Sequence, residues 1–63
     1  MIVFVNGQQI EIHSHARLRD AFLKYCSANG LRYSEEAVAR DQWGNEVMHG
    51  GPAADNGKYY IPL

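Results

Sequence analysis

The chain has 63 residues, of which 46% are hydrophobic and 21% are charged, and its formal net charge is −1. This length predicts a single domain over residues 1–63 with one core, too small for an enclosed pocket, so we expect neither enzyme activity nor a cofactor. A chain without surplus cations is not expected to bind nucleic acid, since phosphates are contacted mainly by Lys and Arg. No stretch approaches the roughly 20 apolar residues that span a bilayer, so no membrane contact is expected. The single cysteine, Cys26, cannot form an internal disulfide, which favours the cytoplasm.

The first twelve residues predict a β-hairpin. Asn6-Gly7 is a strong signal for a type I′ turn, because that turn needs positive φ at both central residues. Residues 1–5 are apolar throughout and predict a central strand, whereas residues 9–13 alternate between polar and apolar. Ile10 and Ile12 should therefore face inward, and pairing across the hairpin places Val3 and Val5 on that same side.

A helix is predicted within residues 14–30. Its apolar positions follow helical spacing and should pack against the hairpin: Leu18, Ala21, Phe22, Tyr25 and Cys26. Ser14 is the expected N-cap, and Asn29-Gly30 is the expected C-terminal stop. Further strands are predicted at residues 37–41, 46–48 and 58–63, with a Gly- and Pro-rich surface loop at residues 49–57.

This order of hairpin, helix and further strands resembles the ubiquitin-like β-grasp family. Met1-Ile-Val-Phe-Val-Asn-Gly7 is similar to the opening of the sulfur carriers of thiamine and molybdopterin synthesis, and Leu18-Arg-Asp-Ala-Phe22 resembles the start of their helix. The stretch from Val38 to Val47 resembles small bacterial ubiquitin-like proteins. The resemblance implies an α+β fold with a mixed four- to five-stranded sheet packed on one helix. It also implies that the first and last strands run parallel at the centre of the sheet.

The sequence departs from the family pattern at its C-terminal residues. Sulfur carriers and modifiers end in a Gly-Gly whose carboxylate is activated, whereas this sequence ends in Tyr60-Ile-Pro-Leu63. Gly50-Gly51 precedes the last predicted strand, so cleavage there would remove a strand from the sheet. We therefore expect a binding module, with a sulfur carrier or protein modifier as the alternative.

Two groups of residues could carry chemistry. His13 and His15 lie two apart, so on an extended strand they could ligate one metal together, with His49 as a third imidazole. Two clear ligands do not make a closed site, and surface histidines are the simpler interpretation, so no metal is predicted. Cys26 has no base beside it in sequence and fits the buried helix face, so we expect a core residue.

The outer face of the sheet is the predicted site. If Val3 and Val5 face the helix, Ile2 and Phe4 lie on the opposite face, where one helix leaves the sheet open. Trp43 and one of Tyr59 or Tyr60 are expected to join them, and a contiguous patch of this kind marks an interaction surface. The residues predicted to bind a protein partner, or a second copy of the chain, are Ile2, Phe4, His13, Trp43 and Tyr60.

Overall fold

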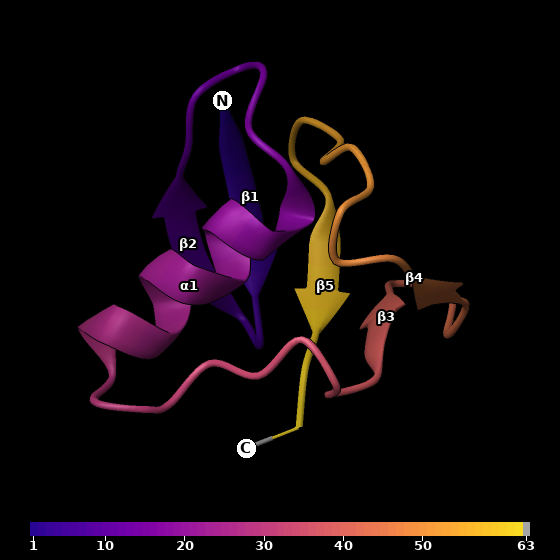
Figure 1. The fold of residues 1–63 in the computed structure, drawn as a ribbon. Helices are drawn as coiled ribbons and strands as arrows, with labels where there is room; N and C mark the ends of the chain where they lie inside the picture. The colour runs from indigo at the N-terminus through magenta and orange to yellow at the C-terminus, as the bar shows by residue number, and fades with distance from the viewer. Residues whose placement is uncertain (63) are drawn as a thin grey trace.

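The computed structural model describes residues 1–62 and contains one helix packed on a five-stranded mixed sheet (Figure 1). The elements are β1 (Ile2–Val5), β2 (Gln8–Glu11), α1 (Leu18–Ala28), β3 (Ala39–Asp41), β4 (Glu46–Val47) and β5 (Lys58–Tyr60). The strand order is β2-β1-β5-β3-β4, with β1 and β5 parallel and the other neighbours antiparallel. The α+β prediction is confirmed, and the arrangement is consistent with a β-grasp-like fold.

The hairpin turn forms as its sequence predicts. Asn6 and Gly7 have φ values of 50° and 84°, and Val3 pairs with Ile10 across β1 and β2. Val3 and Val5 have no exposed surface, so the inner side of the hairpin is the centre of the core.

Asn6 has a second role at the other end of the chain. Its side-chain amide donates to the Ile61 carbonyl and accepts from the Ile61 N–H, each at 3.0 Å. These two bonds replace ladder bonds where β5 has ended, so one residue shapes the hairpin turn and ties down the C-terminal segment.

The helix buries the five residues that the spacing predicts: Leu18, Ala21, Phe22, Tyr25 and Cys26. The helix ends at Ala28, and Asn29 is its C-cap. Gly30 follows with a φ of 66°, and the Leu31 N–H bonds to the Cys26 carbonyl at 2.8 Å. This bond and the left-handed Gly30 are those of a Schellman-type helix end, and they confirm the predicted helix stop.

The predicted N-cap at Ser14 is wrong. The helix begins at Leu18 after the N-cap Arg17, whose own N–H is accepted by the Asp20 carboxylate at 2.9 Å. Helix N–H groups need acceptors, and here the loop after β4 supplies them from a distant part of the chain.

The later strands lie where they are predicted but are shorter. β3 begins at Ala39 and not at Ala37, because residues 34–37 form a turn in which the Ala37 N–H bonds to the Ser34 carbonyl. The parallel pairing of β1 with β5 is confirmed, with Phe4 opposite Lys58 and Val5 opposite Tyr59.

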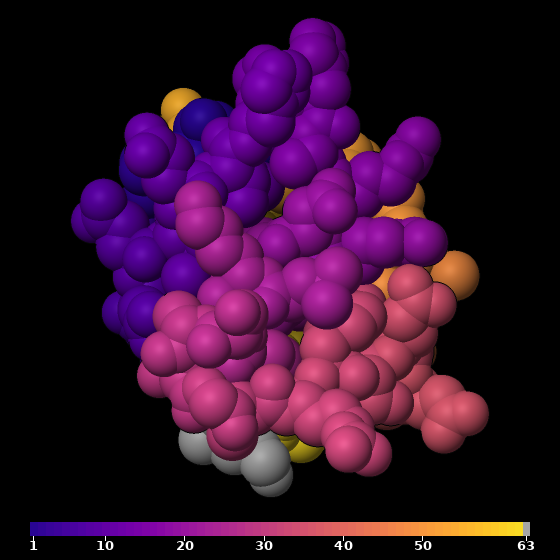
Figure 2. Space-filling view, turned by 60° about the vertical axis from the view of Figure 1, so that its left-hand side comes forward, coloured from indigo at the N-terminus to yellow at the C-terminus, as the bar shows by residue number. Residues whose placement is uncertain are grey.

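One face of the molecule is covered by the helix and its connections. In Figure 2 the purple and magenta residues of α1 and the segment before it lie across the centre, and the pink connection to β3 lies below and to the right. Little of the yellow β5 is visible there, because α1 and the connections on either side of it lie over this side of the sheet. Within the described residues, no helix is long and apolar enough to cross a membrane.

Candidate functional site

The outer face of the sheet carries three of the predicted binding residues among polar and charged neighbours. Ile2 and Phe4 are only half-buried, whereas Tyr60 is 47% exposed. The neighbours that the strand register places beside these three are polar or charged: Glu11, Gln9, Lys58 and Arg40. Ile2 and Phe4 do lie on the face away from the buried Val3 and Val5, as alternation requires. Their patch is interrupted by charges, so it is less apolar than the sequence indicates.

The most exposed large apolar side chains lie elsewhere. Trp43 and Met48 are each 76% exposed, and both line one hollow with Leu18, a residue of the helix side. The structure therefore places Trp43 with the start of α1 and the loop after β4, and not in the outer-face patch of Ile2 and Phe4.

The position of Trp43 follows from the turn that joins β3 to β4. The Asp41 Oδ1 accepts the N–H groups of Trp43 and Asn45, each at 2.9 Å, and Gly44 takes a φ of 82°. An aspartate that bonds its own following backbone fixes a tight turn. Along β3, Ala39 pairs with Val47 and Asp41 pairs with Tyr59, so Asp41 lies on the helix side of the sheet. The turn therefore holds Trp43 close to that side.

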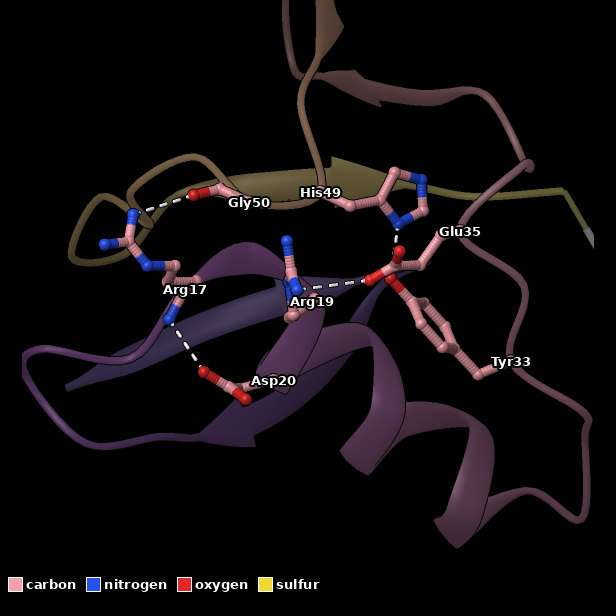
Figure 3. Close-up of polar contacts among 7 residues, drawn as sticks. All are labelled: Arg17, Arg19, Asp20, Tyr33, Glu35, His49 and Gly50. Carbon is pink, nitrogen blue, oxygen red and sulfur yellow. Dashed lines mark hydrogen bonds and ion pairs between the residues drawn. The ribbon is translucent and has the colours of Figure 1, made fainter.

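The other border of the hollow is the loop of residues 48–52, which is bonded to the start of α1 (Figure 3). The Leu18 N–H donates to the Gly51 carbonyl at 3.0 Å, and the Arg19 N–H donates to the His49 carbonyl at 2.7 Å. The Arg17 guanidinium adds a bond to the Gly50 carbonyl at 2.8 Å. The loop therefore caps the helix, and the helix holds the loop in place.

His49 anchors the same loop from its other side (Figure 3). Its Nε2 lies 2.6 Å from the Ala37 carbonyl, and its Nδ1 lies 2.5 Å from the Tyr33 hydroxyl. A carbonyl can only accept, so Nε2 carries a proton, and in the neutral ring Nδ1 accepts from Tyr33. The His49 ring also meets Phe22 edge-on, with centroids 5.3 Å apart. Burial, followed by the nearby Glu35 carboxylate, raises the pKa of Tyr33, which keeps this hydroxyl protonated as a donor.

These anchors define the candidate site, which we name the Trp43 hollow. It has a volume of about 280 Å³. It is lined by Leu18, Asp41, Trp43, Val47, Met48, Gly51, Pro52 and Tyr59. Leu18 and Tyr59 are almost fully buried, so they form its floor, whereas Trp43 and Met48 project at its rim. Apart from the Asp41 carboxylate and the Tyr59 hydroxyl, the lining side chains are apolar.

The histidines do not come together as a metal site. The rings of His13 and His15 lie 5.6 Å apart, and the His15 N–H donates to the His13 Nδ1 at 3.1 Å. Both nitrogens of His49 are already in hydrogen bonds. Over residues 1–62, no group of three or more His, Cys, Asp or Glu side chains is arranged to hold a metal ion. His13 is exposed, as a contact residue would be, but it lines a different hollow from Trp43.

Cys26 is a core residue, as the helical spacing predicts. It is 5% exposed, and burial raises the pKa of its thiol. A protonated thiol is a poor nucleophile, so its surroundings favour packing over reactivity.

Comparison with known proteins adds no family to this description. No protein-family model and no curated protein matches the chain.

Proposed function

We propose that this chain is a small, non-catalytic, ubiquitin-like interaction module of the cytoplasm, and that it binds a protein partner through the Trp43 hollow. The observation that carries the proposal is the joint exposure of Trp43 and Met48 around one apolar depression. Exposed apolar side chains are ordinary when scattered, whereas a cluster around a hollow is typical of a binding surface. Tryptophan is also among the residues that contribute most to binding energy at interfaces.

The construction of the hollow supports the same function. Its two borders are a turn fixed by Asp41 and a loop fixed by bonds to α1 and to His49. A surface that is ordered before binding loses less conformational entropy when a partner docks. The outer face, with half-buried Ile2 and Phe4 among charged neighbours, is the weaker candidate surface.

The sulfur-carrier alternative has less support. Such activity needs a free Gly-Gly terminus, whereas Gly50 and Gly51 lie in the loop whose carbonyls accept bonds from Arg17 and Leu18. Cleavage after Gly51 would detach β5 from the middle of the sheet.

Matched surface variants test the proposal. Trp43→Ala combined with Met48→Ser should abolish capture of a cellular partner, while Tyr60→Ser combined with Phe4→Ser should leave it intact. Each variant is first checked for a native unfolding transition. Loss of capture only in the outer-face pair would show that the partner binds the other side of the sheet. Sedimentation of the same proteins reports whether the partner is a second copy of the chain.

A further inference from the structure

The Trp43 hollow has a smaller neighbour of different chemistry. This second hollow has a volume of about 170 Å³, and it shares Asp41, Trp43 and Tyr59 with the first. Its remaining lining comes from the turns beside β3 and β5: Gln42, Ala54, Asp55, Asn56, Gly57 and Lys58. Trp43 therefore borders an apolar hollow on one side and a hollow lined by two carboxylates on the other.

The volumes limit what can occupy the two hollows. Sites for small molecules and cofactors usually measure about 300–1,000 Å³ and enclose their ligand. The second hollow lies well below this range and the first lies at its lower limit, and both are open at the surface and do not enclose a ligand. Each therefore matches a single side chain of a partner. Two adjoining hollows match two neighbouring side chains of one segment.

The two carboxylates give the second hollow a preference for a positively charged side chain. The Asp41 Oδ1 is occupied by the two turn N–H groups, and among residues 1–62 its Oδ2 takes part in no hydrogen bond. Within the part of the chain that the structure describes, the Asp55 side chain accepts one long bond, 3.3 Å, from the Ile2 N–H. Among the described residues, the one ion pair joins Arg19 to Glu35. Neither Asp41 nor Asp55 is therefore neutralised by a cation in contact with it. Lys58 also lines this hollow and partly offsets their charge.

An exposed indole beside two carboxylates is suited to a cation. A guanidinium or ammonium group gains from the face of a tryptophan ring and from charge-assisted bonds to carboxylate oxygens. We infer that the partner presents an Arg or Lys side chain next to a large apolar side chain. This inference depends on the proposed function, because it assumes that a partner binds at the Trp43 hollow. The cation enters the hollow of Asp41 and Asp55, and the apolar side chain enters the hollow of Leu18 and Met48.

The single tryptophan of the chain provides the measurement, because Trp43 fluorescence reports occupation of either hollow. A random library of short linear peptides is selected against the whole protein, and the enriched peptides are titrated while the fluorescence is followed. We expect enriched peptides to share a basic residue beside a large apolar one. Replacing that Arg by citrulline, which keeps the shape and removes the charge, should weaken binding about fivefold.

Charge variants of the protein give matched controls of opposite sign. Asp55→Asn should weaken the Arg peptide several-fold and leave the citrulline peptide unchanged, whereas Lys58→Gln should tighten the Arg peptide. A selection without binders, or equal binding of Arg and citrulline peptides, would overturn the inference. A different result would refute the proposed function itself: the Trp43→Ala, Met48→Ser variant would still capture the partner. Apolar peptides that bind at Trp43 without any basic preference would keep the function and remove the charge requirement.

Discussion

Replacing His49 by alanine should destabilise the whole domain, because this side chain joins the loop of residues 48–52 to the connection before β3. The substitution removes two hydrogen bonds, to Tyr33 and to Ala37, each worth about 0.5–1.5 kcal/mol. It also removes the edge-on contact with Phe22, worth about 0.5–1.5 kcal/mol. The free energy of unfolding should therefore fall by about 2–4 kcal/mol.

Urea unfolding followed by circular dichroism measures this loss, and thermal unfolding provides a second reading. In a domain of this size, about 1 kcal/mol corresponds to roughly 4–8 °C in Tm, so the variant should melt at least 8 °C lower. Tyr33→Phe retains the ring and removes one hydrogen bond, so it should cost about 1 kcal/mol.

His15→Ala is the matched histidine control. His15 is exposed, and its substitution should change stability by less than about 0.5 kcal/mol. A loss below about 1 kcal/mol in His49→Ala would refute the assigned role of this residue, since two satisfied bonds and an aromatic contact should cost more.

Two further predictions concern the C-terminal tie and the buried thiol. Asn6→Gly preserves the positive φ but removes the paired bonds to Ile61, so the free energy of unfolding should fall by about 1–3 kcal/mol in urea denaturation; an unchanged midpoint would show that the tie is unimportant. Burial raises the pKa of Cys26, so its contribution to stability is complete below the ordinary pKa of an unfolded thiol and is lost as pH rises through the raised folded pKa. The urea midpoint should therefore decline less steeply at alkaline pH in Cys26→Ala than in the natural protein. In a separate assay, Cys26 of the folded protein should react slowly with a thiol reagent at pH 7, and rapid labelling would contradict its burial.

Local features of the sequence predicted the parts of the fold that depend on local chemistry. Asn6-Gly7 and Gly30 occupy positions with positive φ, and the helical spacing of apolar residues identified the buried helix face. These signals depend on residues within one turn or one element, so they can be read without the rest of the molecule.

The features that the sequence did not reveal depend on distant contacts. The start of α1 is capped by carbonyl groups of His49 and Gly51, about thirty residues away, whereas the local sequence offers only Ser14 as an N-cap. His49 appeared only as a third imidazole, because its partners Tyr33 and Ala37 become neighbours only after folding.

The sequence indicates Trp43 as an aromatic contact residue, but it places Trp43 on the outer face with Ile2 and Phe4. The side of the sheet on which Trp43 lies depends on the register of β3 and on the Asp41 turn. Met48 and Pro52 were assigned to a strand end and a loop, and no local signal connects them to Leu18. Alternation along β3 puts Ala39 and Asp41 on one side of the sheet, but Trp43 lies beyond the strand in the turn, where a period of two no longer applies.

Binding of a partner at the Trp43 hollow can be observed directly in solution. The most direct test follows backbone amide NMR shifts of the labelled protein while the captured partner, or an enriched peptide, is added. If the partner binds there, the largest shifts should fall in residues 41–48 and 51–59, with the indole N–H of Trp43 among them and little change at the exposed residues of β2. Shifts centred on Ile2, Phe4 and Tyr60, with Trp43 and Met48 unaffected, would contradict it and would place binding on the outer face of the sheet.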